Sequence, residues 1–236
     1  MNSPHDRPVI SITLICLILM NVSTASAAPE ALPFWKRAKV EVPQKLSPAK
    51  VELLAEPNMT MPLAIYDPQY ANFKVGNPLS IPFVKVAKEP YRVIPDGLTN
   101  GAKPFSDREY AITALPERLS KLTLVQTKMA DKVWVDSRFG IVLSASRPVY
   151  LFLAIDERML ATFEKSGTPG WMQEFAPTGE KIVTDDPLMK LTENAGFLVF
   201  VKKCPAGRIV LGPCCADPNY NSMYVPFFAD AGQADK

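Results

Sequence analysis

The sequence predicts an all-β protein, an antiparallel β-sandwich or jelly roll that is preceded by a proline-rich extended segment. The first observation is an unbroken apolar run at residues 149–155, which follows Pro148, is rich in β-branched and aromatic residues, and stops at Asp156. A short run with no polar face is typical of a strand covered on both sides. The second observation is a series of short apolar runs with Gly, Pro, Asp and Asn between them, as in antiparallel sandwiches.

Residues 1–27 have the order of a secretory signal peptide. A polar stretch that contains Arg7 precedes an apolar run at residues 9–20, and Ala25-Ser26-Ala27 follows. The apolar run is shorter than the roughly 20 residues that a membrane-spanning helix needs. We therefore expect cleavage near Ala27, export to the periplasm or the extracellular space, and no membrane span after processing. An uncleaved N-terminal anchor is the alternative.

The mature chain has almost no net charge and no histidine. Cleavage removes one Arg, one Asp and His5, the only histidine, so the net charge stays at +2. Without a basic block or stripe, nucleic acid is not expected as a partner. Without an imidazole, Ser-His-Asp and Cys-His catalysis and histidine metal sites are excluded for the mature chain. We predict no cofactor.

Residues 28–89 are expected to form a proline-rich arm. Prolines recur from Pro43 to Pro90 and remove backbone donors, so we expect extended segments and edge strands, with at most one helical turn near residues 50–55. A strand is expected near residues 83–86. The aromatic and aliphatic residues of the arm, including Phe34 and Trp35, are too many for a solvated linker, so part of it should pack on the sandwich.

The sandwich itself is expected to span residues 90–232. One or two helical turns are expected at residues 157–165, ended by Gly167. The strands are predicted at residues 122–125, 133–135, 139–145, 149–155, 182–183, 197–201, 209–211 and 223–228.

Three cysteines follow the signal peptide: Cys204, Cys214 and Cys215. In an oxidising compartment, Cys204 is expected to close a loop of about ten residues onto Cys214 or Cys215, which leaves one thiol over. A strained Cys214–Cys215 bridge and buried free thiols are alternatives. A zinc site is disfavoured because no histidine stands nearby.

Asp156, Arg158 and Trp171 are the candidate binding residues. Neighbouring carboxylates suit glycosidic chemistry, but residues 156 and 157 point to opposite faces of a strand. The simplest interpretation of Asp156 is that it pairs with Arg158 at the end of the strand. Asp185-Asp186-Pro187 is most simply a turn, with a calcium loop as the weaker interpretation. Trp171 follows a glycine turn, where an indole either stacks on a sugar ring or seals the loop.

Three groups of residues carry a resemblance to a known domain. The motifs are Gly97-Leu98 through Asp107-Arg108-Glu109-Tyr110 to Leu115-Pro116 and Leu119; Val149-Tyr150-Leu151 with Asp156-Glu157-Arg158 and Pro169-Gly170-Trp171; and Pro205-Ala206-Gly207 to Leu211-Gly212 with Ser222-Met223-Tyr224. In this order they resemble the galactose-binding-like β-sandwich that accompanies secreted bacterial polysaccharide lyases, glycoside hydrolases and other surface proteins. The resemblance covers about residues 90–230. Pro213-Cys214-Cys215 departs from it by replacing a Gly/Asn-rich turn.

The resemblance implies a binding role, because such a module usually accompanies a separate active domain. We therefore predict an exported, non-catalytic accessory or binding module for a polysaccharide or glycan, with Trp171, Asp156 and Arg158 as ligand contacts. One alternative is a structural or protein-interaction component of the envelope, which binds an envelope protein through residues 29–90. A small polysaccharide lyase or hydrolase is the third hypothesis.

Overall fold

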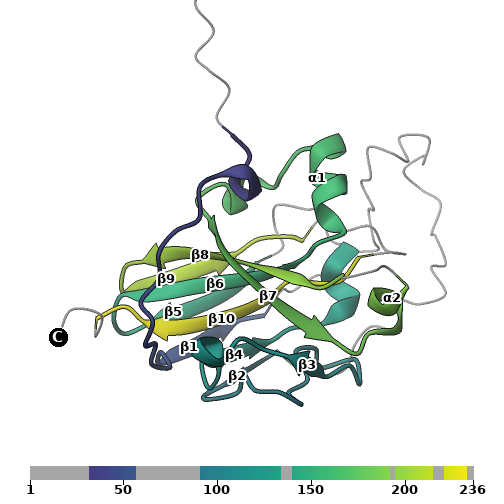
Figure 1. Ribbon diagram of the computed structural model, residues 1–236. Helices are drawn as coiled ribbons and strands as arrows, with labels where there is room; N and C mark the ends of the chain where they lie inside the picture. The colour runs from purple at the N-terminus through teal and green to yellow at the C-terminus, as the bar shows by residue number, and fades with distance from the viewer. Residues whose placement is uncertain (1–31, 57–90, 134–139, 192–194, 215–220, 233–236) are drawn as a thin grey trace, which may run out of the picture. The chain divides into compact units, whose positions relative to one another are not determined.

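The computed structural model of the protein describes residues 32–56, 91–133, 140–191, 195–214 and 221–232 (Figure 1). The predicted signal peptide and the strand expected at residues 83–86 lie outside these ranges, as does most of the strand expected at residues 133–135.

The described residues form mostly strands, with short helices between them. The strands are β1 (Val51–Ala55), β2 (Arg92–Ile94), β3 (Ile112–Ala114), β4 (Thr123–Gln126), β5 (Ile141–Ala145), β6 (Val149–Asp156), β7 (Ala176–Thr184), β8 (Phe197–Cys204), β9 (Gly207–Leu211) and β10 (Val225–Asp230). The α-helices are α1 (Met159–Ser166) and α2 (Pro187–Lys190), and the 3-10 helices are η1 (Phe34–Lys36), η3 (Glu117–Leu119), η4 (Met129–Val133) and η5 (Gly170–Met172).

The strands make two sheets, and the predicted all-β sandwich class is confirmed. The smaller sheet has three strands in the order β1-β5-β9, and the larger has seven in the order β2-β4-β10-β6-β8-β7-β3. All strand pairs within these sheets are antiparallel.

Strand β6 lies in the middle of the larger sheet, between β10 and β8 (Figure 1). Its eight residues all pair with β8, from Val149 opposite Cys204 to Asp156 opposite Phe197. Every residue of β6 except Tyr150 is buried. The apolar run therefore has both faces covered, as its composition predicts.

The turn between β5 and β6 is one of the places where the chain passes from one sheet to the other. Strand β5 ends at Ala145 in the smaller sheet, and β6 begins at Val149 in the larger one. In β5 the buried residues alternate with partly exposed ones, and the buried Ile141 and Leu143 stand opposite the buried Leu211 and Ile209 of β9. The period of two places these side chains on one face of the smaller sheet, which contributes to the core.

The N-terminal part of the described chain packs on the sandwich and also adds a strand to it. The Phe34 ring is fully buried, 4.8 Å from the Phe200 ring and 6.3 Å from the Phe163 ring. The expectation of extended segments and edge strands is confirmed at residues 51–55, where Val51 pairs with Ala145 and the segment forms the edge strand β1 in place of the one helical turn that the sequence allows there. A five-residue helix is too short to be stable by itself, whereas the ladder with β5 supplies backbone hydrogen bonds.

The start of the strand expected at residues 133–135 is also wrong, because Val133 ends the helix η4. The Asp107 carboxylate accepts hydrogen bonds from the backbone N–H groups of Met129, at 2.7 Å, and Ala130, at 3.0 Å. These bonds satisfy two N–H groups at the start of the helix and favour the helical turn.

Helix α1 confirms the helical turns expected after β6. It ends where Gly167 adopts a positive φ of 82° and donates its N–H to the Phe163 carbonyl at 2.9 Å. Glycine reaches this backbone conformation without the strain that a side chain would cause. Among the residues that the structure describes, no helix is long and apolar enough to span a membrane.

Candidate functional site

The Asp156 carboxylate is fully buried at the end of β6 and is saturated with hydrogen bonds. Its Oδ1 accepts from the Arg158 backbone N–H at 3.0 Å and from Arg158 Nε at 2.9 Å. Its Oδ2 accepts from Arg158 Nη2 at 2.6 Å and from the Ser222 backbone N–H at 2.8 Å. Asp156 therefore holds Arg158 in a two-pronged ion pair and ties the Ser222 segment to the strand end.

This pair belongs to a larger group, which we name the strand-end clasp: Asp156, Arg158, Asp186 and Ser222. The Ser222 hydroxyl donates to Asp186 Oδ2 at 3.4 Å, and Asp186 Oδ1 accepts from the Leu188 N–H at 2.9 Å, which caps α2. Arg158 Nη1 donates to the Leu188 carbonyl at 3.2 Å. Asp186 thus acts as a turn and cap residue, and no group of three potential metal ligands gathers anywhere in the described ranges.

Two further titratable side chains, Lys132 and Tyr110, interact electrostatically with carboxylates of the clasp. Burial lowers the pKa of Lys132, and the charge of Arg108 lowers it further, whereas Cys214, Asp156 and Asp186 oppose the shift. Lys132 Nζ donates to the main-chain carbonyl of Asn221. Burial, followed by the charge of Asp186, raises the pKa of Tyr110. The clasp end of the sandwich therefore holds charges of both signs, of which Asp156 and Arg158 form an ion pair.

Replacing Lys132 by methionine should change the pH dependence of stability. The pKa of Lys132 is lowered in the folded protein, whereas in the unfolded chain it has the ordinary lysine value of about 10.4. At a pH between these two values, the unfolded chain keeps a proton on Lys132 that the folded protein has lost. Wild-type stability should therefore rise relative to the Lys132→Met variant as the pH increases through this window. Urea denaturation of both proteins at pH 7 and pH 10 measures the difference. If the difference in free energy of unfolding between the two proteins did not change with pH, the environment of Lys132 would not disfavour its charged form.

Trp171 lies on η5 with its ring partly buried and its polar atom bonded. Nε1 donates to the Pro213 carbonyl at 3.1 Å, and the ring meets the rings of Phe175 and Tyr224 edge-on at 6.1 Å and 5.4 Å. The Tyr224 hydroxyl donates to the Gly212 carbonyl at 2.7 Å. The indole therefore packs on the segment that joins β9 to the clasp, as expected of an aromatic residue that seals a loop.

Replacing Gly212 by alanine should destabilise the fold by about 1–3 kcal/mol. A Cβ at this position would lie 2.5 Å from Trp171 Cδ1 and 2.7 Å from Nε1, so the indole would have to move. The movement should weaken the bond of Trp171 to Pro213 and change the tryptophan fluorescence. Gly170→Ala is the matched control, because a Cβ there meets no atom within 4 Å. Equal stabilities of the two variants would contradict this packing.

The two described cysteines lie at opposite ends of β6. Cys204 pairs with Val149, whereas Cys214 Sγ lies 3.8 Å from the sulfur of Met159, beyond the other end of the strand. The seven steps between the first and last residues of β6, at about 3.3 Å each, separate these ends by roughly 23 Å, and a disulfide needs Cα atoms within about 7 Å. The Cys204–Cys214 bridge expected from the sequence is therefore wrong, and no such bond is present. Cys215 lies outside the described residues, so a bridge to it stays a prediction.

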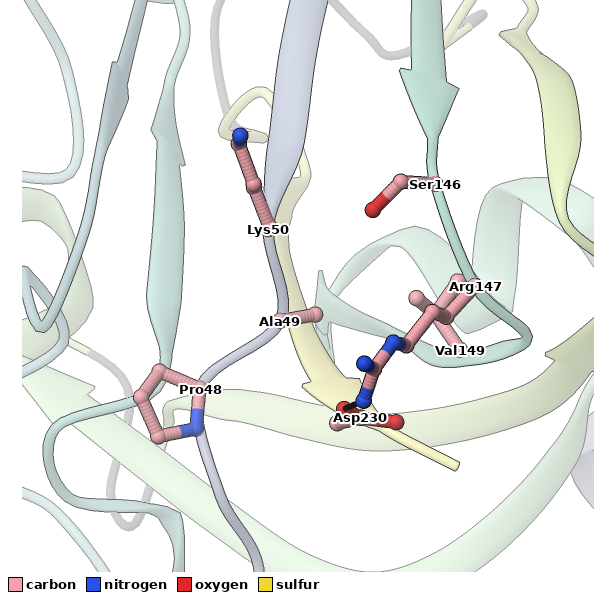
Figure 2. A pocket seen from close by; sticks show the side chains of 7 residues that line it. All are labelled: Pro48, Ala49, Lys50, Ser146, Arg147, Val149 and Asp230. Atoms are coloured by element: carbon pink, nitrogen blue, oxygen red, sulfur yellow. Dashed lines mark ion pairs between the residues drawn. The ribbon is translucent and has the colours of Figure 1, made fainter. Parts of the chain in front are cut away.

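At the N-terminal end of β6, beside Val149, is a hollow of about 290 Å³, which we name the hairpin pocket (Figure 2). Its walls come from the approach to β1, the β5–β6 turn with the start of β6, and the end of β10. The lining residues are Pro48, Ala49, Lys50, Ser146, Arg147, Val149 and Asp230. In Figure 2 the Arg147 side chain points toward Asp230, whereas Lys50 extends away from that pair.

Polar groups of the hairpin pocket retain much of their hydrogen-bonding capacity. Arg147 Nη1 lies 3.9 Å from Asp230 Oδ2, which is too long for a hydrogen bond. Within the described part of the chain, no hydrogen bond is formed by the side chains of Lys50, Ser146 or Arg147. Asp230 Oδ1 accepts from the Gly232 N–H at 2.7 Å, which leaves Oδ2 available. The pocket thus combines unused donors with an unused acceptor.

The sequence predicts part of the clasp but not the hairpin pocket. The Asp156–Arg158 pair follows from residues two apart, and Trp171 packs on the segment that precedes the clasp. The pocket joins Lys50, Arg147 and Asp230 from three distant parts of the chain. Its one local signal is Ser146-Arg147-Pro148, a polar turn directly before the most apolar strand.

Neither a protein family model nor a curated protein matches this chain. Among solved structures, a β-glucuronidase from glycoside hydrolase family 2 superposes with a TM-score of 0.46 at 18% identity, over 63% of this chain and 14% of that one. A glycoside hydrolase family 138 enzyme that targets pectin rhamnogalacturonan II gives a TM-score of 0.44 at 16% identity, over 81% of this chain and 17% of that one. The chain spans less than a fifth of either protein. Similarities this distant carry no argument about function.

Proposed function

We propose that this protein is an exported, non-catalytic glycan-binding module and that the hairpin pocket is its ligand site. The observation that carries the proposal is the unused hydrogen-bonding capacity of Arg147, Ser146 and Asp230 around one hollow of about 290 Å³. Sugar hydroxyl groups both donate and accept, so a wall with Arg147 donors beside the Asp230 Oδ2 acceptor suits adjacent hydroxyls. The order of residues 1–27, which is that of a signal peptide, supports the proposed export.

The resemblance of residues 90–230 to galactose-binding-like sandwiches supports a binding role for the module. The wall of the pocket is formed by turns and strand ends at one end of the sheets, where loops are held in place by the strands. The pocket lies at the lower end of the usual size range for small-molecule sites, which suits one sugar residue of a longer chain.

The second location for a glycan is the clasp end, where the sequence places Trp171, Asp156 and Arg158 as ligand contacts. Trp171 and Arg158 are both partly exposed there. Asp156 is enclosed, so its part in such a site is to position Arg158. The hairpin pocket has the stronger support, because the polar atoms of the clasp already bond one another.

A glycan array probed with four proteins tests the function and the location together. The wild type should bind at least one glycan saturably, and Arg147→Ala should abolish that binding. Arg208→Ala is the matched control, since Arg208 is an exposed cation on β9 that does not line the pocket, and it should retain binding. Trp171→Phe, which keeps an aromatic ring, should also retain it.

Two other outcomes would move the ligand site or overturn the function. Loss of binding in Trp171→Phe with retention in Arg147→Ala would place the ligand at the clasp end. Absence of binding by the folded wild type would overturn the glycan proposal. That result would favour the envelope-protein alternative, because residues 32–56 expose Leu32, Val40 and Leu54.

A further inference from the structure

We infer that the hairpin pocket selects a sugar residue that carries a carboxylate, such as a uronate, over its neutral counterpart. This inference rests on the proposed glycan-binding function and narrows it to acidic glycans. It depends on three features of the pocket: the loosely held Arg147, the fixed position of Asp230, and the excess of positive charge (Figure 2).

Arg147 is available to an incoming anion. Its side chain is 70% exposed, and its ion pair with Asp230 spans 3.9 Å without a hydrogen bond. An exposed pair of this length is weak, so a ligand group can engage the guanidinium at little cost. The planar guanidinium presents paired N–H donors whose spacing matches the two oxygens of a carboxylate. A carboxylate is therefore the sugar substituent that Arg147 recognises best.

Asp230 is held in place by its backbone and gives the site a direction. Its N–H donates to the Ser47 carbonyl at 2.9 Å, and it pairs with Val149 across the β10–β6 ladder. Its carboxylate repels a ligand carboxylate but accepts a hydroxyl hydrogen. A bound uronate should therefore place its carboxylate on the Arg147 side of the pocket and a ring hydroxyl on Asp230 Oδ2.

The charges at this end of the sandwich favour an anionic ligand. Lys50 and Arg147 line the pocket, and Asp230 is the only acidic residue among its lining residues. Lys50 is exposed and lines the pocket. Its ammonium charge can therefore act on a ligand in the pocket at physiological salt. The local excess of cations should attract acidic glycans.

Pairs of glycans that differ only in one carboxylate test the inference. Uronate-bearing oligosaccharides and their carboxyl-reduced counterparts are titrated calorimetrically into the wild type, Arg147→Gln and Arg208→Gln, after circular dichroism shows that each is folded. The acidic member should bind the wild type and Arg208→Gln at least about 10-fold more tightly than its reduced counterpart. Arg147→Gln should lose this preference, and added salt should weaken only the binding of the acidic member.

The results separate this inference from the function on which it rests. Equal binding of the acidic and reduced members, or binding of neutral glycans alone, would overturn the selection of acidic sugars and leave a glycan-binding module. A preference that persists in Arg147→Gln would also overturn it, because the carboxylate would then be bound elsewhere. Absence of binding to both members of every pair, and to all neutral glycans on the array, would overturn both proposals.

Discussion

Replacing Asp156 by alanine is expected to lower the free energy of unfolding by about 3–5 kcal/mol, a large fraction of the stability of a typical domain. The Asp156 side chain is fully buried and that of Arg158 is 15% exposed, so the pair lies largely out of water. Without the carboxylate, Arg158 keeps a poorly solvated charge and the Ser222 N–H loses its acceptor. Both effects destabilise the folded state. Urea denaturation measures the change in free energy.

A matched ion pair shows whether burial is the cause. Lys36 and Glu164 form a pair at 2.9 Å, close to the Asp156–Arg158 distances, but their side chains are 51% and 53% exposed. Glu164→Ala should therefore change the free energy of unfolding by less than about 1 kcal/mol. Similar losses in Glu164→Ala and Asp156→Ala would contradict the role given to burial.

A double variant distinguishes the loss of the ion pair from the effect of changing the volume of the two side chains. Asp156→Leu with Arg158→Leu removes both charges and leaves no unpaired ion, so it should be less destabilised than Asp156→Leu alone. If the two substitutions were additive, Asp156 and Arg158 would not act as a pair. The Ser222 N–H remains without its acceptor in both proteins, so this contribution cancels in the comparison.

The larger features of the fold could be predicted because they rest on local patterns. The apolar run of β6 has no polar face, and the Asp156–Arg158 pair closes within three residues of one strand end. Helix α1 ends at Gly167, a position that favours glycine through its positive φ. Such signals need only neighbouring residues to be read.

Features that depend on distant partners could not be predicted in the same way. The sequence of β1, Val-Glu-Leu-Leu-Ala, has neither strict alternation nor strongly branched composition, and it becomes a strand because β5 offers a free edge. The three-residue strands β2 and β3 are likewise too short to carry a pattern. The packing of Trp171 on Gly212 and the walls of the hairpin pocket join segments whose proximity depends on the whole sheet order.

The second large effect is expected at Phe34, in the proline-rich arm that the sequence predicts to pack in part on the sandwich. Phe34→Ala should destabilise the protein by about 3–5 kcal/mol, because the ring is fully buried and its removal leaves a cavity against Phe200. The edge-on contact with Phe200 at 4.8 Å adds an aromatic contribution to the burial. Urea denaturation should show a lower midpoint with an unchanged slope.

Leu32→Ala is the matched control for Phe34→Ala, since Leu32 lies two residues away and is 61% exposed. It should change the free energy of unfolding by less than about 0.5 kcal/mol. If Phe34→Ala also had so small an effect, or if unfolding split into two transitions, residues 32–56 would be an appendage that binds a finished sandwich. A single transition with a large loss would instead make them a part of its core, since β1 completes the smaller sheet and Phe34 covers Phe200 of the larger one.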